Sequence, residues 1–271
     1  LVQRPDTHPF VWVADTLRGL NLVSNFEHGQ VGLEMDSYYF SPKAFEALVK
    51  CLPEYRFVDS RELVNWVRSV KSDSEIELMR GAAAICESAM ATAMESIAVG
   101  VRQCDAAAAI SAAQVRGTDD FGGDHPAIVP MLPTGEGADT PHLTWTDRPF
   151  RDGESTVVEL TGVFRHYHVP MARTISLGRP DPRMAGLAAA TDDALGAVLA
   201  EMRPGVQTSD LAATWNRELG RAGFHKPSRI GYSIGIAYAP DWGERTISLR
   251  SDDATILQRN MTFHVIGGMW L

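Results

Sequence analysis

Cysteine is scarce in this chain of 271 residues, which contains only Cys51, Cys86 and Cys104. The number is odd and no two of them are spaced as Cys-x-x-Cys, so the sequence favours neither a disulfide framework nor a thiolate zinc site. A reducing compartment is therefore expected. The first residues also lack the apolar segment of a signal peptide, and we predict a cytoplasmic protein.

Long apolar runs and long basic runs are missing as well. No segment carries enough consecutive apolar residues to cross a bilayer. The chain has 34 acidic and 25 basic residues, a net charge of -9, whereas phosphate binding needs a basic face. We therefore expect no binding to nucleic acid or to membranes, and we expect small molecules or other proteins as partners.

Two domains are predicted. Residues 31–60 alternate short apolar runs with a helical pattern (GLEMDSYYF, AFEALVKCL, EYRFVDS), which indicates strand, helix and strand at the end of an α/β domain that covers residues 1–70. The second domain covers residues 71–271. It stops in apolar sequence, GGMWL, so we expect its C-terminal end to be missing.

The second domain opens with a predicted long helix. Ser72 and Glu75 have the spacing of a capping box, and an apolar stripe with helical period follows them. Because of this period, we interpret the methionines of the stripe as core residues. The stripe consists of Ile76, Met79, Ala83, Cys86, Met90, Met94 and Ile97.

A short internal repeat follows. AVGVRQCDAAAAISAAQVRG (residues 98–117) and RPGVQTSDLAATWNRELGRAGF (residues 203–224) share Gly-Val, then an Asp, then a pair of alanines. Each copy is preceded by a long helical pattern and followed by strand-like sequence. We therefore predict two related helix-helix-sheet halves with a cleft between them.

Residues 157–178, VVELTGVFRHYHVPMARTISLG, combine strand-like sequence with polar groups. His166 and His168 are two positions apart and would share one face of a strand, so they are either metal ligands or histidines that hydrogen-bond at a rim. Glu159 interrupts an apolar run in what should be a central strand. A carboxylate there is costly unless it is paired or functional.

Three further polar residues stand out, His142 in PTGEGADTPHLTW, Glu244 in APDWGERT, and Arg173. Taken singly, each has an ordinary structural interpretation: a loop histidine, a solvated acid beside Arg245, and a salt-bridge partner. Glu159 is therefore the strongest single indication of chemistry.

The chain resembles the pita-bread hydrolases (peptidase family M24), which include methionine aminopeptidase, aminopeptidase P, prolidase and creatinase, over essentially all of its length. VKSDSEIELMRGAA is similar to the linker helix that joins the two domains of these proteins, and the internal repeat agrees with the two-fold pseudosymmetry of their fold. The resemblance implies an α+β chain in which the end of an α/β N-terminal domain precedes a pita-bread catalytic domain.

The metallopeptidases of this family bind two metal ions through two Asp, one His and two Glu. At the matching positions this sequence has Glu159, Pro170, Tyr232 and Ile266, and the last Glu position lies beyond Leu271. Proline and isoleucine side chains bind no metal, and a neutral phenol is a poor replacement for imidazole. We therefore predict no metal and no other cofactor.

Four blocks are similar to the metal-independent, creatinase-like ectoine hydrolase branch: LPTGEGADTPHLTWTDRPF, VELTGVFRHYHVPMART, RIGYSIGIAYAPDWGERT and MTFHVIGGMW. This resemblance implies ring opening of the cyclic amidine ectoine at a C–N bond, which gives N-acetyl-diaminobutyrate. His142 would transfer the proton and Glu159 would pair with the amidinium and activate water or attack directly. Glu244 would hold the second amidine nitrogen or orient His142.

The remaining residues of the expected site would contact the substrate, an amidine or guanidinium compound, and Arg173 is the candidate partner of its carboxylate. The resemblance also implies a homodimer. Three alternatives stay open: an amidinohydrolase for creatine or another guanidino compound, a Xaa-Pro peptidase-like metalloenzyme, and a catalytically silent binding module. The substrate-contacting candidates are Tyr167, His168, Arg173, Tyr232, Trp242 and His264, with His166 as a further wall residue.

Overall fold

The computed structural model describes residues 5–20 and 29–270, and the chain divides into two compact units, Leu1–Trp66 and Val67–Leu271. The elements of the first unit are α1 (Pro9–Gly19), β1 (Gln30–Leu33), α2 (Pro42–Cys51) and β2 (Arg56–Asp59), and α3 (Leu63–Arg68) spans the junction. The second unit contains α4 (Asp73–Ser96), α5 (Gln103–Arg116), the 3-10 helix η1 (Gly135–Asp139), β3 (Ser155–Phe164), β4 (Tyr167–Ser176), α6 (Pro182–Glu201), α7 (Thr208–Arg221), β5 (Gly231–Tyr238), β6 (Asp241–Ser248) and β7 (Phe263–Val265).

The first unit is built on a parallel pair of strands. β1 and β2 pair in parallel, and α2 connects them, as a parallel pair requires a crossover. The predicted strand, helix and strand within residues 31–60 are therefore confirmed. Ala14 of α1 packs with Leu48 of α2 and with Leu52 in the buried cluster of this unit.

Helix α4 begins at the predicted capping box. The Ser72 hydroxyl accepts a hydrogen bond from the Glu75 amide, and the Glu75 carboxylate accepts one from the Ser72 amide at 2.7 Å. Met79 and Met90 lie in the core as predicted, but Met94 is 54% exposed. Its assignment to the core was wrong, because the buried positions at this end of α4 are Ala93 and Ile97, and Met94 lies on an exposed side of the helix.

The predicted internal repeat is confirmed in the backbone. In each of the pairs α4–α5 and α6–α7, a long helix is followed by a shorter helix of 14 residues. Gly100 and Gly205 precede the shorter helices with φ of 89° and 92°, a region that favours glycine. Their amides donate to Phe150 O and Leu257 O, both at 2.9 Å. The two halves therefore repeat the same turn and the same contact to a following segment.

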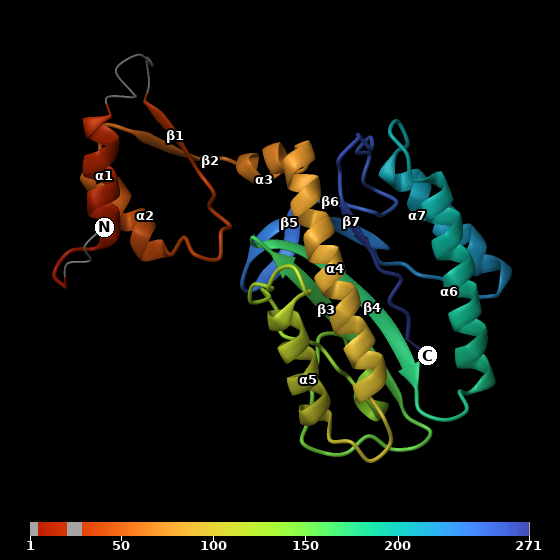
Figure 1. Cartoon of the computed structure of the whole chain (residues 1–271). Helices are drawn as coiled ribbons and strands as arrows, with labels where there is room; N and C mark the ends of the chain where they lie inside the picture. Colours follow the sequence, from red (N-terminus) through yellow and green to blue (C-terminus); the bar gives the residue numbers. More distant parts are fainter. Residues whose placement is uncertain (1–4, 21–28, 271) are drawn as a thin grey trace. The chain divides into compact units, whose positions relative to one another are not determined.

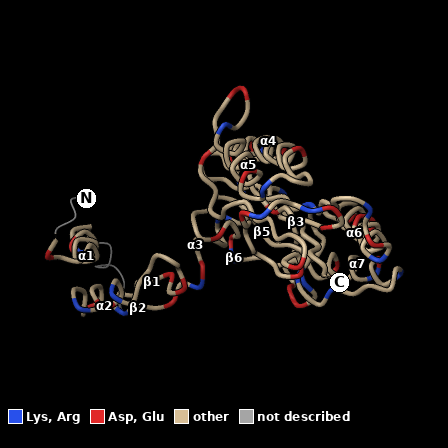
Figure 2. The backbone as a smooth tube through the Cα atoms, turned by 90° about the horizontal axis from the view of Figure 1, so that it is seen from below, with Lys and Arg blue, Asp and Glu red and all other residues tan. Residues whose placement is uncertain are grey.

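The sheet of the second unit has the order β3-β4-β5-β6, with β7 paired to β5, and all its pairs are antiparallel. Figure 1 shows α4 crossing β3 and β4 with α5 beside it, and α6 and α7 lying next to each other. Each helix pair has its own buried cluster. Acidic and basic residues are interspersed along this unit (Figure 2).

No helix in the described part of the chain is long and apolar enough to span a bilayer.

We expect Gly162→Ala to destabilise the fold. Gly162 lies where β3 meets α4, and an added Cβ would clash with the backbone of Ala82 and Cys86, so the strand or the helix must shift. The free energy of unfolding should fall by about 1–3 kcal/mol in chemical denaturation. Gly186→Ala in α6 is the matched control, because its Cβ would meet nothing within 4 Å and should stabilise the helix slightly. Equal midpoints for the two variants would contradict this packing.

Candidate active site

Glu159 lies in the middle of β3, and two neighbouring segments fix its backbone. It is opposite Ala172 of β4, and on its other side its amide and carbonyl hydrogen-bond to Met131 at 3.1 and 2.9 Å. The side chain is only 13% exposed. The carboxylate is therefore held in place by the sheet and largely removed from water.

Burial determines the acidity of this carboxyl group. It raises the pKa of Glu159 to about 7, and the positive charge of Arg229 opposes part of the shift. A carboxyl group with a pKa near neutrality is present in both protonation states at pH 7. It can accept or return a proton there, which an ordinary glutamate does poorly.

Tyr232, Trp242 and His264 form a hydrogen-bonded chain beside Glu159. Tyr232 of β5 pairs with His264 of β7 across the sheet. The Trp242 indole donates to the Tyr232 oxygen at 2.7 Å, and that oxygen lies 3.0 Å from His264 Nδ1. His264 Nδ1 is also 3.9 Å from Glu159 Oε1. Four strands, β3, β5, β6 and β7, therefore bring their polar groups to one place.

The protonation states in this chain follow from burial. It lowers the pKa of His264 to about 3, with Arg229 adding to the shift, and raises the pKa of the Tyr232 phenol well above its usual range. Both groups are neutral at pH 7. The hydrogen bond between the Tyr232 hydroxyl and His264 Nδ1 therefore joins two uncharged groups. The contact of His264 with Glu159 is not an ion pair.

Arg229 was missed by the sequence analysis. Its guanidinium lies 4.4 Å from the centroid of the Tyr232 ring, and its charge acts on both Glu159 and His264. It is exposed and precedes β5 by two positions. One indication of its role was present in the sequence: Arg229 lies three residues before Tyr232, a predicted substrate-contacting residue, in SRIGY.

Glu244 lies in a different environment. Its Oε1 is 2.7 Å from the Lys71 ammonium, and both side chains are about 1% exposed. Lys71 also donates to Ser69 O at 3.2 Å. Burial raises the pKa of Glu244, and Lys71 opposes the shift. Its predicted neighbour, His142, is not among these contacts, so the carboxylate is engaged by a lysine that the sequence analysis did not consider.

His142 lies after η1 on a loop and is exposed, with φ of 65°. Within residues 5–20 and 29–270, its imidazole makes no hydrogen bond or ion pair. The structure therefore does not join the three predicted catalytic residues by direct contact. Glu159 lies with His264 and Tyr232, and Glu244 lies with Lys71.

The other predicted residues have defined partners. The Tyr167 hydroxyl donates to Glu75 at 2.8 Å. The His168 ring accepts from the Ala127 amide at 3.0 Å and donates to the His166 carbonyl at 2.8 Å, and burial lowers its pKa to about 4. Its ring is thus neutral and hydrogen-bonded to backbone on both sides, which leaves no lone pair for a metal.

Arg173 and His166 lie at the surface of the β3–β4 hairpin. Arg173 is exposed, and its guanidinium donates to Ala172 O at 2.7 Å. The His166 ring stacks on Tyr238 with the centroids 4.7 Å apart.

The sequence matches known hydrolases over its whole length. The family model for metallopeptidase family M24 matches residues 77–271. The chain is 44% identical to ectoine hydrolase from Halomonas elongata, with 100% of this chain and 68% of that protein aligned. It is 42% identical to an uncharacterised hydrolase/peptidase of Sinorhizobium fredii, with the same coverage. The predicted family resemblance is therefore confirmed.

Solved structures confirm the predicted α+β pita-bread fold. A prolidase from Thermococcus sibiricus superposes with a TM-score of 0.81 at 17% identity, covering 98% of this chain and 69% of that one. The X-Pro aminopeptidase from Thermotoga maritima gives 0.76 at 18% identity, covering 97% and 70%. At these identities the likeness concerns the fold alone.

The family pattern implies two metal ions, and the residues at the matching positions do not fit them. Glu159 offers the one carboxylate, Pro170 lies opposite Thr161 in the β3–β4 ladder, and Ile266 is aliphatic. Tyr232 stays protonated and its oxygen already has two hydrogen-bond partners. At the four matching positions within this sequence, a single carboxylate and a neutral phenol are a poor donor set for a dinuclear centre.

We expect Lys71→Met to unfold the protein more easily. The substitution leaves the Glu244 carboxylate buried without its cation, which should lower the free energy of unfolding by about 3–5 kcal/mol. Lys71→Met combined with Glu244→Gln removes both charges and should recover most of this loss. Arg80→Met, which breaks an exposed pair with Glu77, should change stability by less than about 1 kcal/mol. Equal effects for Lys71→Met and Arg80→Met would refute a structural ion pair.

Proposed function

The chain belongs to metallopeptidase family M24, and we propose that it is a hydrolase that opens the ring of ectoine at a C–N bond without a bound metal ion. One observation carries the proposal: at the position of the family's first metal ligand, Glu159 is a buried carboxyl group with a pKa of about 7, next to a protonated Tyr232 and a neutral His264. The 44% identity to ectoine hydrolase supports the substrate.

Ectoine presents an amidinium and a carboxylate, and the site offers a partner for each. Ionised Glu159 pairs with the amidinium, which offsets the cost of burying both charges. Arg229 pairs with the carboxylate. We assign this role to Arg229 instead of Arg173, because Arg229 lies over Tyr232 and its charge acts on Glu159, whereas Arg173 is exposed and bonded to Ala172 O.

The reaction consumes one water. In one route the Glu159 carboxylate takes a proton from water while the water oxygen bonds to the amidine carbon, and in the other the carboxylate attacks first and water then releases the product. The ring C–N bond breaks as the departing nitrogen gains a proton. We assign that proton to His142, the role that the family resemblance implies for it.

Glu244 has a positioning role in this proposal. Its carboxylate is engaged by Lys71, and it lies on β6 two residues after Trp242, which holds the Tyr232 hydroxyl. His168 likewise holds the backbone at Ala127 and His166.

The homodimer and the cytoplasmic location stay predictions. A guanidinium has the same delocalised charge as an amidinium, so creatine is the compound to compare with ectoine.

We expect Glu159→Gln to abolish ectoine hydrolysis. The amide can neither accept the proton nor attack, so kcat/KM should fall by more than about a hundredfold. In the wild type, activity needs the ionised carboxylate, so kcat/KM should rise with pH and level off above about pH 7. Product formation from ectoine, followed by chromatography from pH 5 to 9, measures both effects.

The controls for Glu159→Gln separate folding and metal content from chemistry. The variant should melt no lower than the wild type, because a neutral amide is cheaper to bury than a carboxylate. Wild-type protein treated with EDTA and freed of metal should keep its rate on ectoine. If EDTA abolished the rate and a divalent metal restored it, the reaction would not be metal-free. If the protein turned over creatine and not ectoine, the assignment of ectoine as the substrate would be refuted.

We expect Arg229→Gln to weaken substrate binding. Without its carboxylate partner, ectoine should show a KM raised by about tenfold, with a smaller change in kcat. Removal of the cation should also raise the pKa of Glu159 further, so the pH profile should shift to higher pH. Arg173→Gln is the matched control and should leave KM and the profile unchanged. A raised KM in Arg173→Gln with an unchanged KM in Arg229→Gln would instead assign the binding of the ectoine carboxylate to Arg173.

A further inference from the structure

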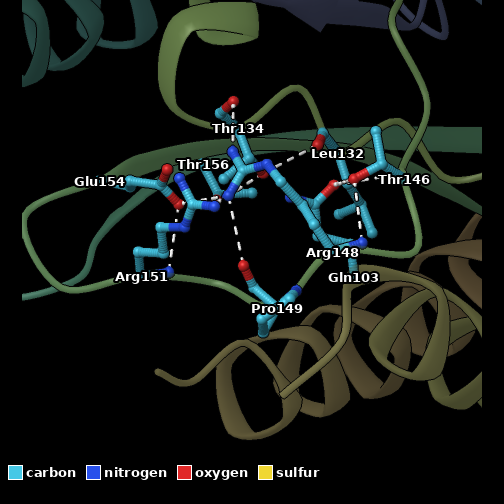
Figure 3. Close-up of polar contacts among 9 residues, drawn as sticks. All are labelled: Gln103, Leu132, Thr134, Thr146, Arg148, Pro149, Arg151, Glu154 and Thr156. Atoms are coloured by element: carbon cyan, nitrogen blue, oxygen red, sulfur yellow. Dashed lines mark hydrogen bonds and ion pairs between the residues drawn. The ribbon is translucent and has the colours of Figure 1, made fainter. Parts of the chain in front are cut away.

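A cavity of about 480 Å³ lies apart from Glu159, which does not line it. It is bounded by the first residue of α5, by residues 132–137 and by residues 143–154. Leu132, Leu143 and Trp145 form its apolar lining. A cavity of this size and mixed lining suits a small organic molecule. Figure 3 shows its polar residues.

Gln103 supplies an unused donor to this cavity. Its side chain is 2% exposed, and its Oε1 accepts hydrogen bonds from the Thr146 amide and hydroxyl at 2.9 and 3.0 Å. The amide donor of Thr146 fixes which end of the Gln103 side chain is oxygen. Gln103 Nε2 is buried and has no hydrogen-bond partner within the described residues. A buried donor left unpaired is costly, so this atom is suited to an acceptor in the cavity.

The cavity also has an excess of positive charge at one side. The Glu154 carboxylate bonds to the Arg148 guanidinium at 2.9 Å and to the Arg151 amide at 3.1 Å. Arg148 also donates to Pro149 O and Thr134 O, whereas the Arg151 side chain is exposed. Both arginine charges lower the pKa of Glu154. Figure 3 shows the Glu154 carboxylate bonded to the Arg148 guanidinium and to the Arg151 backbone amide.

The balance of charges selects the ligand. The Arg148 guanidinium is paired with Glu154, whereas Arg151 reaches this carboxylate only through its backbone amide. Within the described residues the Arg151 guanidinium makes no hydrogen bond or ion pair, so it is free to turn toward an anion. Glu136, the other acid of the lining, is exposed on η1, and no hydrogen bond or ion pair joins it to Arg151 within the described residues. The ligand must also carry a neutral hydrogen-bond acceptor that faces Gln103 Nε2 and an apolar part that contacts Leu143 and Trp145.

We propose that this cavity is a second binding site, for a small carboxylate that also carries a neutral carbonyl, such as an N-acylated amino acid. Arg151 binds the carboxylate, Gln103 Nε2 donates to the carbonyl, and Trp145 covers the apolar part. Binding at this site does not require the proposed reaction to be correct. Leu143 of its lining directly follows His142 in the sequence.

Calorimetric titration of the full chain with N-acetyl-L-leucine tests the proposal. The uncharged methyl ester of the same compound should bind at least about tenfold more weakly, as should N-acetyl-L-leucine to Arg151→Gln. Gln103→Glu keeps the acceptor for Thr146 but replaces the donor, and should also lose about tenfold. Arg116→Gln is the matched control and should bind like wild type, because Arg116 is exposed at the far end of α5, about 20 Å along the axis.

Three outcomes would overturn the second site: no heat of binding at millimolar ligand, equal affinity for acid and ester, or wild-type affinity in Arg151→Gln. If Gln103→Glu does not fold, the Arg151→Gln result alone tests the second site. That variant should fold, because the Arg151 side chain is exposed and the hydrogen bond from its backbone amide to Glu154 is kept. Ectoine turnover, measured on the same proteins, should be unchanged in Arg151→Gln without added ligand. A failed ectoine assay would therefore leave the binding result standing.

Discussion

The cost of burying one carboxyl group in the middle of a sheet governs the arrangement of the site. Glu159 is removed from water by its strand neighbours, and the opposing charge of Arg229 only partly offsets the penalty, so its pKa rises to about 7. The same dry environment keeps His264 and Tyr232 neutral. The site therefore holds neutral hydrogen-bonding groups around a single acid whose charge can change.

Two buried glutamates, one on β3 and one on β6, differ in whether a cation lies beside them. Glu159 and Glu244 are both removed from water, and burial raises the pKa of both. Glu244 has the Lys71 ammonium at 2.7 Å, a pair whose loss would leave a buried charge, and such pairs are retained for structure. Glu159 has no cation at that distance in the described chain. It alone keeps a carboxylate available for a ligand.

Local patterns predicted what lies close in sequence. The capping box at Ser72 and Glu75, the helix that follows it and the internal repeat that contains Gly100 and Gly205 all appear as predicted. Glu159 was recognised because an acid in an apolar strand is unusual. Lys71 and Glu244 are 173 positions apart, and Arg229 reaches Tyr232 from an irregular segment, so no periodicity records either contact. Such contacts depend on the tertiary fold, which no single stretch of sequence encodes.

The proposed reaction gives a physical reason for losing the family's metal ligands. A metal centre stabilises its carboxylates with divalent cations, whereas an amidinium substrate brings a positive charge of its own. When that charge binds beside Glu159 it must lower the pKa of the carboxyl, because a close opposite charge favours the ionised form. The free enzyme then keeps Glu159 partly protonated, which lowers the cost of its burial, and the ionised base is formed when the substrate arrives. Bound metal ions at the same place would repel the amidinium, so a cationic substrate and a dinuclear centre compete for one carboxylate.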